Sequence, residues 1–183
     1  MKSLLYSQPM VAALLAKVKT ETRRTAGLEK VNENPGDWRI NGVVMVKGIA
    51  VVEFRDKREY FELCKPRFQV GDIYYVKETW ATKDIDMGSY NDKKVIYKAD
   101  NPNEMDRNNW KSSMFMPEWA SRLKRQITAV KCERVQDITE AGAIAEGVKS
   151  RAEYAILFDK INPGAWEKGV WVWVYHFKEV SHD

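Results

Sequence analysis

The chain has 183 residues, the size of one domain, and 44% of them are hydrophobic, enough to build a core. Its formal net charge of +4 permits nucleic-acid binding but is low for a dedicated binder. Cys64 and Cys132 are the only cysteines, which argues against a disulfide scaffold. The first residues lack the apolar run of a signal peptide, and no segment approaches the roughly 20 apolar residues of a membrane span. We therefore expect a soluble, cytoplasmic protein with no membrane partner.

The first half of the chain predicts one helix followed by strands. Apolar residues at helical spacing after Ser7 predict a helix that buries one face and ends near Val18 or Lys19; the buried face comprises Met10, Val11, Leu14, Leu15 and Val18. Residues 43–46 and 49–54 predict two strands around a Lys47-Gly48 turn. Residues 73–80 form an aromatic and β-branched run that predicts a further strand. Residues 82–113 are polar, with one short strand candidate at 95–98, and predict a long excursion from the core.

The second half alternates helices and strands. It predicts a short helix at 118–123, a strand at 127–135 and a helix near 154–161. Between the last two, Thr139 is the predicted N-cap of a short helix that runs through Glu146 and stops at Gly147. The last strand, 170–177, is the clearest, with Val170, Val172, Val174 and His176 on one face and Trp171, Trp173, Tyr175 and Phe177 on the other. Several strands separated by short helices predict an α+β fold, a small, partly open β-barrel with flanking helices, in one domain spanning 1–183.

Several kinds of chemistry lack the residues they need. His176 and His182 are the only histidines, and no His/Asp/Glu group has metal-ligand spacing, so we expect neither a metal centre nor another cofactor. No glycine-rich phosphate loop follows a strand, which argues against nucleotide-triphosphate hydrolysis. A Ser-His-Asp site stays open on sequence alone, but no nucleophile-elbow motif supports one.

The polar run Lys19-Thr20-Glu21-Thr22-Arg23-Arg24 follows the predicted first helix. In an extended chain, Thr20, Thr22 and Arg24 would share one face and Lys19, Glu21 and Arg23 the other. A lysine in an apolar site loses its proton more easily than in water, so Lys19 could act as the base for a threonine hydroxyl. Glu146, at the end of its predicted helix, offers the matching acid. On spacing alone, a solvated helix exit remains the alternative.

Six segments spread from residue 7 to residue 178 resemble the bacterial and phage branch of the ASCH-domain family: the run at 19–24, and residues 71–80, 116–122, 135–140, 145–148 and 170–177. The resemblance implies a PUA-like β-barrel, with local insertions at about 40–62 and 82–113. Family members are thought to bind RNA or nucleotide-like ligands. One bacterial branch hydrolyses the acetyl amide of N4-acetylcytidine to acetate and cytidine. Its catalytic Lys, Thr and Glu match Lys19, Thr22 and Glu146, with Arg24 as the motif arginine.

The resemblance therefore favours an amidohydrolase, an enzyme that cleaves a non-peptide C–N bond, acting on an acylated nucleoside. Lys19 would activate Thr22, Arg24 or backbone N–H groups would stabilise the oxyanion, and Glu146 would protonate the departing amine. Trp80 would stack the base, and the other candidate substrate-binding residues are Thr20, Arg23 and Glu78. For Glu78, a solvated strand residue is the alternative interpretation. A non-catalytic module that binds single-stranded RNA or DNA in the same cleft through Arg23, Arg24, Lys124 and Arg125 is the main alternative, and a ribonuclease is a third. The sequence leaves the oligomeric state open.

Overall fold

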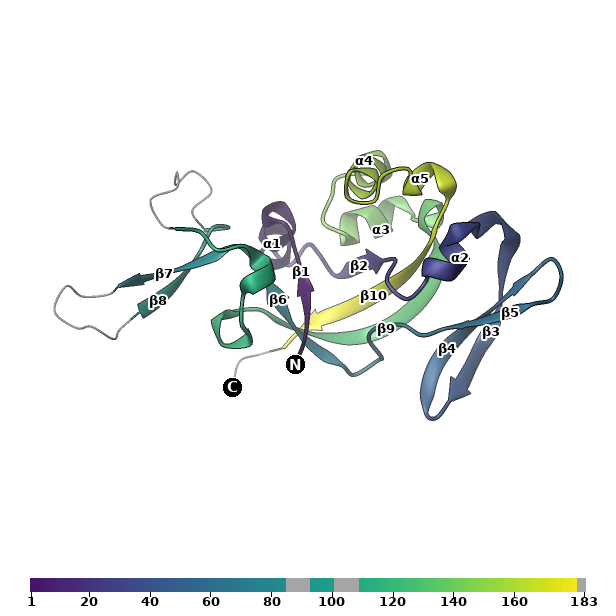
Figure 1. Ribbon diagram of the computed structural model, residues 1–183. Helices are drawn as coiled ribbons and strands as arrows, with labels where there is room; N and C mark the ends of the chain where they lie inside the picture. Colours follow the sequence, from purple (N-terminus) through teal and green to yellow (C-terminus); the bar gives the residue numbers. More distant parts are fainter. Residues whose placement is uncertain (85–92, 101–108, 181–183) are drawn as a thin grey trace. The chain divides into compact units, whose positions relative to one another are not determined.

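The computed structural model describes residues 1–84, 93–100 and 109–180, which form an α+β fold (Figure 1). The chain divides into two compact units. The first contains Met1–Lys17, Ile73–Gln126 and the end of the chain from Glu179, and the second contains Val18–Asp72 and Ile127–Lys178. The described strands form open sheets, and none of these sheets closes into a barrel.

The first unit begins with a strand and a short helix. β1 (Lys2–Leu5) pairs in parallel with β6 (Ile73–Lys77), and β6 pairs antiparallel with the start of β9 (Lys124–Arg134). Helix α1 (Gln8–Leu15) buries Val11 and Leu14. It ends before the predicted Val18 or Lys19, because Lys17 adopts a left-handed backbone conformation with φ of 59°. Leu15 and Val18 are exposed, so their prediction as core residues of this helix was wrong.

The strand predicted at 73–80 is broken in two. After β6 ends, the Glu78 amide donates to the Met116 sulfur at 3.2 Å instead of to a strand partner, and β7 (Trp80–Asp84) then pairs with β8 (Lys93–Tyr97). The strand candidate at 95–98 is thus confirmed, and the observed strand begins two residues earlier than predicted. The helix predicted at 118–123 is only a 3₁₀ turn, η3 (Glu118–Ala120), preceded by η2 (Ser113–Phe115). Within the polar excursion, residues 85–92 and 101–108 lie outside the described part.

The second unit contains the predicted hairpin. β3 (Trp38–Val46) pairs with β4 (Ile49–Asp56), and β5 (Phe61–Cys64) adds a third strand. The turn between β3 and β4 is confirmed at Lys47 and Gly48, which both have positive φ, as a two-residue type I′ hairpin turn requires. Two short elements precede the hairpin, helix α2 (Glu29–Glu33) and the 3₁₀ turn η1 (Pro35–Asp37).

Strand β10 (Trp171–Glu179) is the centre of the second unit and lies between β9 and β2 (Glu21–Arg24). Its valines pack against α3 (Glu140–Ala145), α4 (Arg151–Ile161) and the short α5 (Ala165–Lys168), on one side of β2 and β10 in Figure 1. Its aromatic residues face the other way, where Trp171 contacts Phe54 and Tyr175 contacts Phe68. The two faces predicted for β10 are therefore confirmed. Strand β9 starts three residues earlier than predicted and is followed by the 3₁₀ turn η4 (Val135–Asp137).

Replacing Gly27 with alanine is expected to lower the free energy of unfolding by about 1–3 kcal/mol. Gly27 has φ of +87°, and an added Cβ would lie 2.9 Å from the backbone oxygen of Lys65. Gly48→Ala is the matched control, because Gly48 also has positive φ (+76°) but open space around the Cβ position. Urea unfolding of both variants separates the backbone cost from the clash, and equal losses would contradict the close contact.

Candidate functional site

Lys19 lies two residues before the start of β2 and is held there by the backbone of its neighbour, Thr20. The Thr20 amide donates to the Ala145 carbonyl at 2.8 Å, and the Thr20 carbonyl accepts from the Phe177 amide at 3.0 Å. These bonds tie the segment to α3 on one side and to β10 on the other. Lys19 itself is only 3% exposed. Its side chain therefore ends inside the second unit.

The end of α3 supplies the partner of Lys19. The helix begins at Thr139, whose hydroxyl accepts from the Gly142 amide at 3.0 Å as predicted for an N-cap, and it stops at Gly147, which has φ of 93°. Glu146 is thereby fixed at the C-cap. Lys19 Nζ donates to Glu146 Oε2 and to the Glu146 backbone oxygen, both at 2.6 Å. The structure thus brings together Lys19 and Glu146, the base and the acid predicted from the sequence.

Arg23 is the second cation at this carboxylate. Its Nη1 donates to Glu146 Oε1 at 3.3 Å, so that Lys19 and Arg23 contact different oxygens of one side chain. Its Nε donates to Glu133 Oε1 at 2.9 Å, and its Nη1 also donates to Glu21 Oε2 at 3.3 Å. Glu133 is on β9 and Arg23 on β2, with β10 between them, so the arginine side chain reaches across a whole strand.

The site is a buried network of charges. Lys19 and Arg23 face the carboxylates of Glu21, Glu133 and Glu146, and further partners lie at its rim: Lys131 Nζ is 2.9 Å from Glu133, and His176 Nδ1 is 3.0 Å from Glu21. We call the five central residues the charge network: Lys19, Glu21, Arg23, Glu133 and Glu146. A network of this kind can hold, store and move protons, because burial makes the energy of each charge depend strongly on its neighbours.

The electrostatics of Lys19 favour its use as a base. Burial lowers the pKa of the Lys19 ammonium below its ordinary value, Glu146 opposes the shift, and the positive charges of Arg24 and Arg23 add to the lowering. Burial acts in the same direction on Arg23, but Glu146 and Glu133 outweigh it and raise the pKa of the guanidinium. Of the two cations, Lys19 is therefore the one that loses its proton more easily.

Thr22 and Arg24 occupy the opposite face of β2 from Arg23. Thr22 pairs with Tyr175 and Arg24 with Trp173, in a register where Arg23 pairs with Val174. Thr22 is 3% exposed, whereas Thr20, before the strand, is exposed. The alternation predicted for an extended segment 19–24 is confirmed for the residues of β2. Thr22, the candidate nucleophile, and Arg24, the motif arginine, therefore lie on the side of β2 opposite Arg23.

Glu78 and Trp80, predicted as substrate-binding residues, belong to the first unit. Both oxygens of Glu78 are paired with Arg122, at 2.9 Å from Nε and 3.1 Å from Nη2, and Arg122 Nη1 also binds Asp100. Glu78 is 2% exposed, so the alternative interpretation of it as a solvated strand residue was wrong. Trp80 is buried, with the Lys111 ammonium 4.7 Å from its ring centre and Trp119 packed edge-on.

Sequence reasoning missed Glu133 as a partner of the site. It named Glu21 only as part of the motif. His176 is half-buried and contacts Glu21. Glu21 could have been found, because residues two apart in a strand share a face and Glu21 stands two before Arg23. No sequence pattern identifies Glu133, because its contact depends on the order of β9, β10 and β2.

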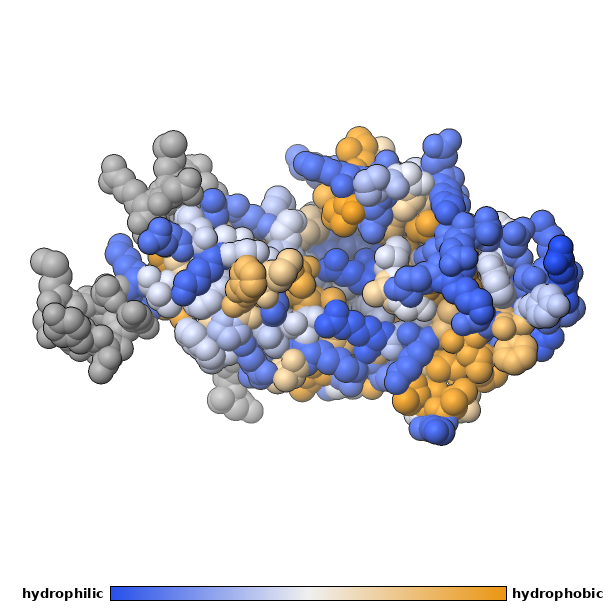
Figure 2. All heavy atoms as spheres, in the orientation of Figure 1, coloured by the Kyte–Doolittle hydropathy of each residue, from blue (hydrophilic) through white to orange (hydrophobic). Residues whose placement is uncertain are grey.

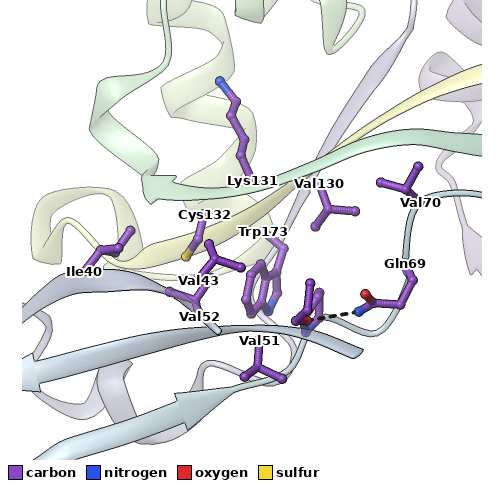
Figure 3. A pocket seen from close by; sticks show the side chains of 12 residues that line it. Ile40, Val43, Val51, Val52, Gln69, Val70, Val130, Lys131, Cys132 and Trp173 are labelled. Carbon is purple, nitrogen blue, oxygen red and sulfur yellow. Dashed lines mark hydrogen bonds between the residues drawn. The ribbon is translucent and has the colours of Figure 1, made fainter. Parts of the chain in front are cut away.

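An apolar cavity of about 290 Å³ lies elsewhere in the second unit (Figure 3). Val43 and Val52 of the hairpin, Val130 and Cys132 of β9, and Trp173 line it, and Lys131 points away from it in Figure 3. Figure 2 shows apolar side chains gathered over the same hairpin, where Val43 and Met45 are exposed. None of the site residues predicted from the sequence lines this cavity.

Comparison with known proteins adds one structural likeness. The sequence matches no protein-family model, and no curated protein matches it. Among solved structures, the chain is similar to protein EF3133 from Enterococcus faecalis V583, described under the family name DUF984. The two proteins share 10% identity over 98% of this chain and 76% of that one, with a TM-score of 0.47.

Within residues 1–84, 93–100 and 109–180, no group of three or more His, Cys, Asp and Glu side chains is arranged to hold a metal ion. None of the helices in this part of the chain is long and apolar enough to cross a membrane.

Proposed function

We propose that this chain belongs to the ASCH-domain family and is an amidohydrolase that removes an acyl group from the exocyclic amine of a cytidine-like nucleoside. The observation that carries the proposal is the buried contact of Lys19 Nζ with Glu146 Oε2 at 2.6 Å, between two residues that match the catalytic lysine and glutamate of the N4-acetylcytidine branch. A buried lysine with a lowered pKa beside a carboxylate is an arrangement suited to acid–base catalysis.

The short hydrogen bond gives the pair two forms that contain the same number of protons. In one form Lys19 is an ammonium and Glu146 a carboxylate; moving the shared proton from Nζ to Oε2 makes a neutral amine and a carboxylic acid. The second form is the reactive one, because an amine can accept a proton and an acid can donate one. Exclusion of water by a bound nucleoside favours it, since burial disfavours both charges.

The reaction then divides into two balanced halves. Lys19 takes the proton of the Thr22 hydroxyl as Thr22 Oγ attacks the acyl carbon, and Glu146 gives its proton to the exocyclic amine as the C–N bond breaks. Because the register of β2 places Thr22 on the face opposite Arg23, this half requires a rearrangement of β2 that brings Thr22 Oγ to Lys19 Nζ when substrate binds. In the second half, Glu146 takes a proton from the attacking water and Lys19 returns one to Thr22. The acyl group leaves as an acid and both residues are restored. The role of Thr22 comes from the family resemblance, and Arg24 on the same face of β2 is the candidate oxyanion donor.

The test is incubation of the pure protein with N4-acetylcytidine, followed by chromatography of the products. We expect cytidine and acetate in equal amounts. Quenching at short times should also reveal, by mass spectrometry, one acetyl group on the peptide that contains Thr22, and that group should be missing in Thr22→Ala. Absence of turnover with N4-acetylcytidine and with related N4-acyl cytidines would overturn the proposal.

The second candidate function is RNA binding without catalysis, because the charges of Lys19 and Glu146 are already satisfied by each other and by their neighbours. Basic side chains such as Arg24 would then contact phosphate, and unpaired bases of a single-stranded RNA would stack on aromatic residues. This candidate predicts RNA binding that weakens steeply with added salt, by a protein that releases no acetate. A gel-shift series across salt concentrations distinguishes the two.

A further inference from the structure

The Glu146 carboxylate is divided between two cations. Its Oε2 accepts from Lys19 and its Oε1 accepts from Arg23, at 2.6 Å and 3.3 Å. If the Glu146 carboxylate contacted Lys19 alone, its full negative charge would interact with the Lys19 ammonium and stabilise it strongly. Because Arg23 keeps its proton, it permanently withdraws part of this stabilisation from Lys19.

Arg23 is itself held in place by one carboxylate on another strand of the second unit and by one on its own strand. Glu133 on β9 accepts from its Nε at 2.9 Å, and Glu21 on β2 accepts from its Nη1. On the helix side, the Tyr154 ring of α4 lies 5.9 Å from the guanidinium carbon, and a Cβ at Gly142 of α3 would lie 3.1 Å from Nη2. The guanidinium therefore has little freedom to move toward or away from Glu146.

We propose that Arg23 is a positioning residue that shares the Glu146 carboxylate with Lys19 and thereby keeps Lys19 ready to act as a base. Its anchor is Glu133, and neither residue touches the substrate in this scheme. The inference rests on the proposed function for its catalytic meaning, but the charge coupling that it describes exists in the protein without any substrate.

The groups that face Lys19 and Glu146 support the proposed direction of the effect. Arg23 and Arg24 place positive charge near Lys19, and the Tyr154 hydroxyl stays neutral because burial raises its pKa. Loss of Arg23 would remove a positive neighbour and leave Glu146 to Lys19 alone. Both changes stabilise the ammonium, so both raise the pKa of Lys19.

The test follows the titration of Lys19 by NMR with lysine labelled at the ε-carbon, with its resonance assigned by its loss in Lys19→Met. In Arg23→Met we expect the Lys19 midpoint to rise by about one pH unit or more. Arg23→Lys, which keeps the charge, should lie between this variant and the wild type. Arg55→Met, which removes an arginine of the same unit paired with Glu53 and Glu59, should leave the midpoint unchanged. An unchanged or lower midpoint in Arg23→Met would overturn the proposal.

Glu133→Gln provides a second measurement if Arg23→Met does not fold, because it removes one negative charge and leaves Arg23 bound to Glu146 and Glu21. We expect the Lys19 midpoint to fall in this variant, and a rise would contradict the scheme. If the protein deacylates N4-acetylcytidine, Arg23→Met should also lose activity, because a more stable ammonium makes the neutral amine–acid form rarer, and Arg23→Lys, which keeps the charge, should recover part of it. If it does not turn over, the NMR titration still decides the role of Arg23, independently of the proposed function.

Discussion

Lys19→Met is expected to lower kcat/KM for the deacylation of N4-acetylcytidine by about 10²–10⁴-fold, the usual contribution of a positioned acid–base group. The substitution removes the group that accepts the Thr22 proton and the donor that holds Glu146 Oε2 at 2.6 Å. Methionine keeps most of the side-chain volume in a position that is 3% exposed, so the packing around it should survive. The measurement is initial rate against substrate concentration, with unfolding followed by circular dichroism on the same samples.

Lys178→Met is the control for Lys19→Met, because Lys178 lies on the exposed end of β10 and its loss should leave both rate and stability unchanged. Glu146→Gln, which keeps the shape of the acid but carries no exchangeable carboxyl proton, should fall in the same range as Lys19→Met. The two effects should not add in the double variant, because the residues act as one pair. A Lys19→Met protein that is folded and turns over at the wild-type rate would refute the mechanism.

Three parts of the fold followed directly from the sequence because local patterns determine them. The strand at 170–177 carries apolar residues on both faces, and each face found its own layer, helices for the valines and Phe54 and Phe68 for the aromatic residues. The turn at Lys47 and Gly48 and the cap at Thr139 are set within a few residues of chain, so they were also predictable. Element ends were less predictable, as the early stop of α1 at a left-handed Lys17 shows.

The candidate site was predictable only in part, for the same physical reason. Lys19 and Glu146 came from the resemblance, and the cap at Thr139 placed Glu146 at a helix end without saying what it faces. The contact of Arg23 with Glu133 arises from strand order, which no local pattern carries. The pairing of Glu78 with Arg122 likewise joins residues 44 positions apart and interrupts a run with strong strand propensity. At these positions the contacts of buried charge pairs determine the local structure, although the secondary-structure preferences of the surrounding residues favour a different one.

Arg122→Met is expected to destabilise the protein by about 3–5 kcal/mol, the typical cost of removing one partner of a buried ion pair. Glu78 is 2% exposed, and Arg122 satisfies both of its oxygens. Without the guanidinium, the carboxylate is left in an apolar cluster around Trp80 and Met116. The measurement is urea unfolding at pH 8, and Glu78→Gln/Arg122→Met should recover part of the loss, because an amide can be buried without a charge.

The pH dependence separates this mechanism from a simple loss of packing. Burial raises the pKa of Glu78 above its ordinary value even beside Arg122, and removal of the cation would raise it further. In the Arg122→Met protein the folded state would then bind a proton that the unfolded state has already released, from about pH 4.5 up to the raised pKa. Stability must fall as pH rises through that window. The deficit should therefore be smaller at pH 5 than at pH 8 in Arg122→Met, and it should not grow with pH in the double variant, where residue 78 no longer titrates. The guanidinium carbon of Arg122 lies 4.0 Å from the centre of the Tyr97 ring. An equal deficit at both pH values would show that Arg122 acts through this packing and not through its charge.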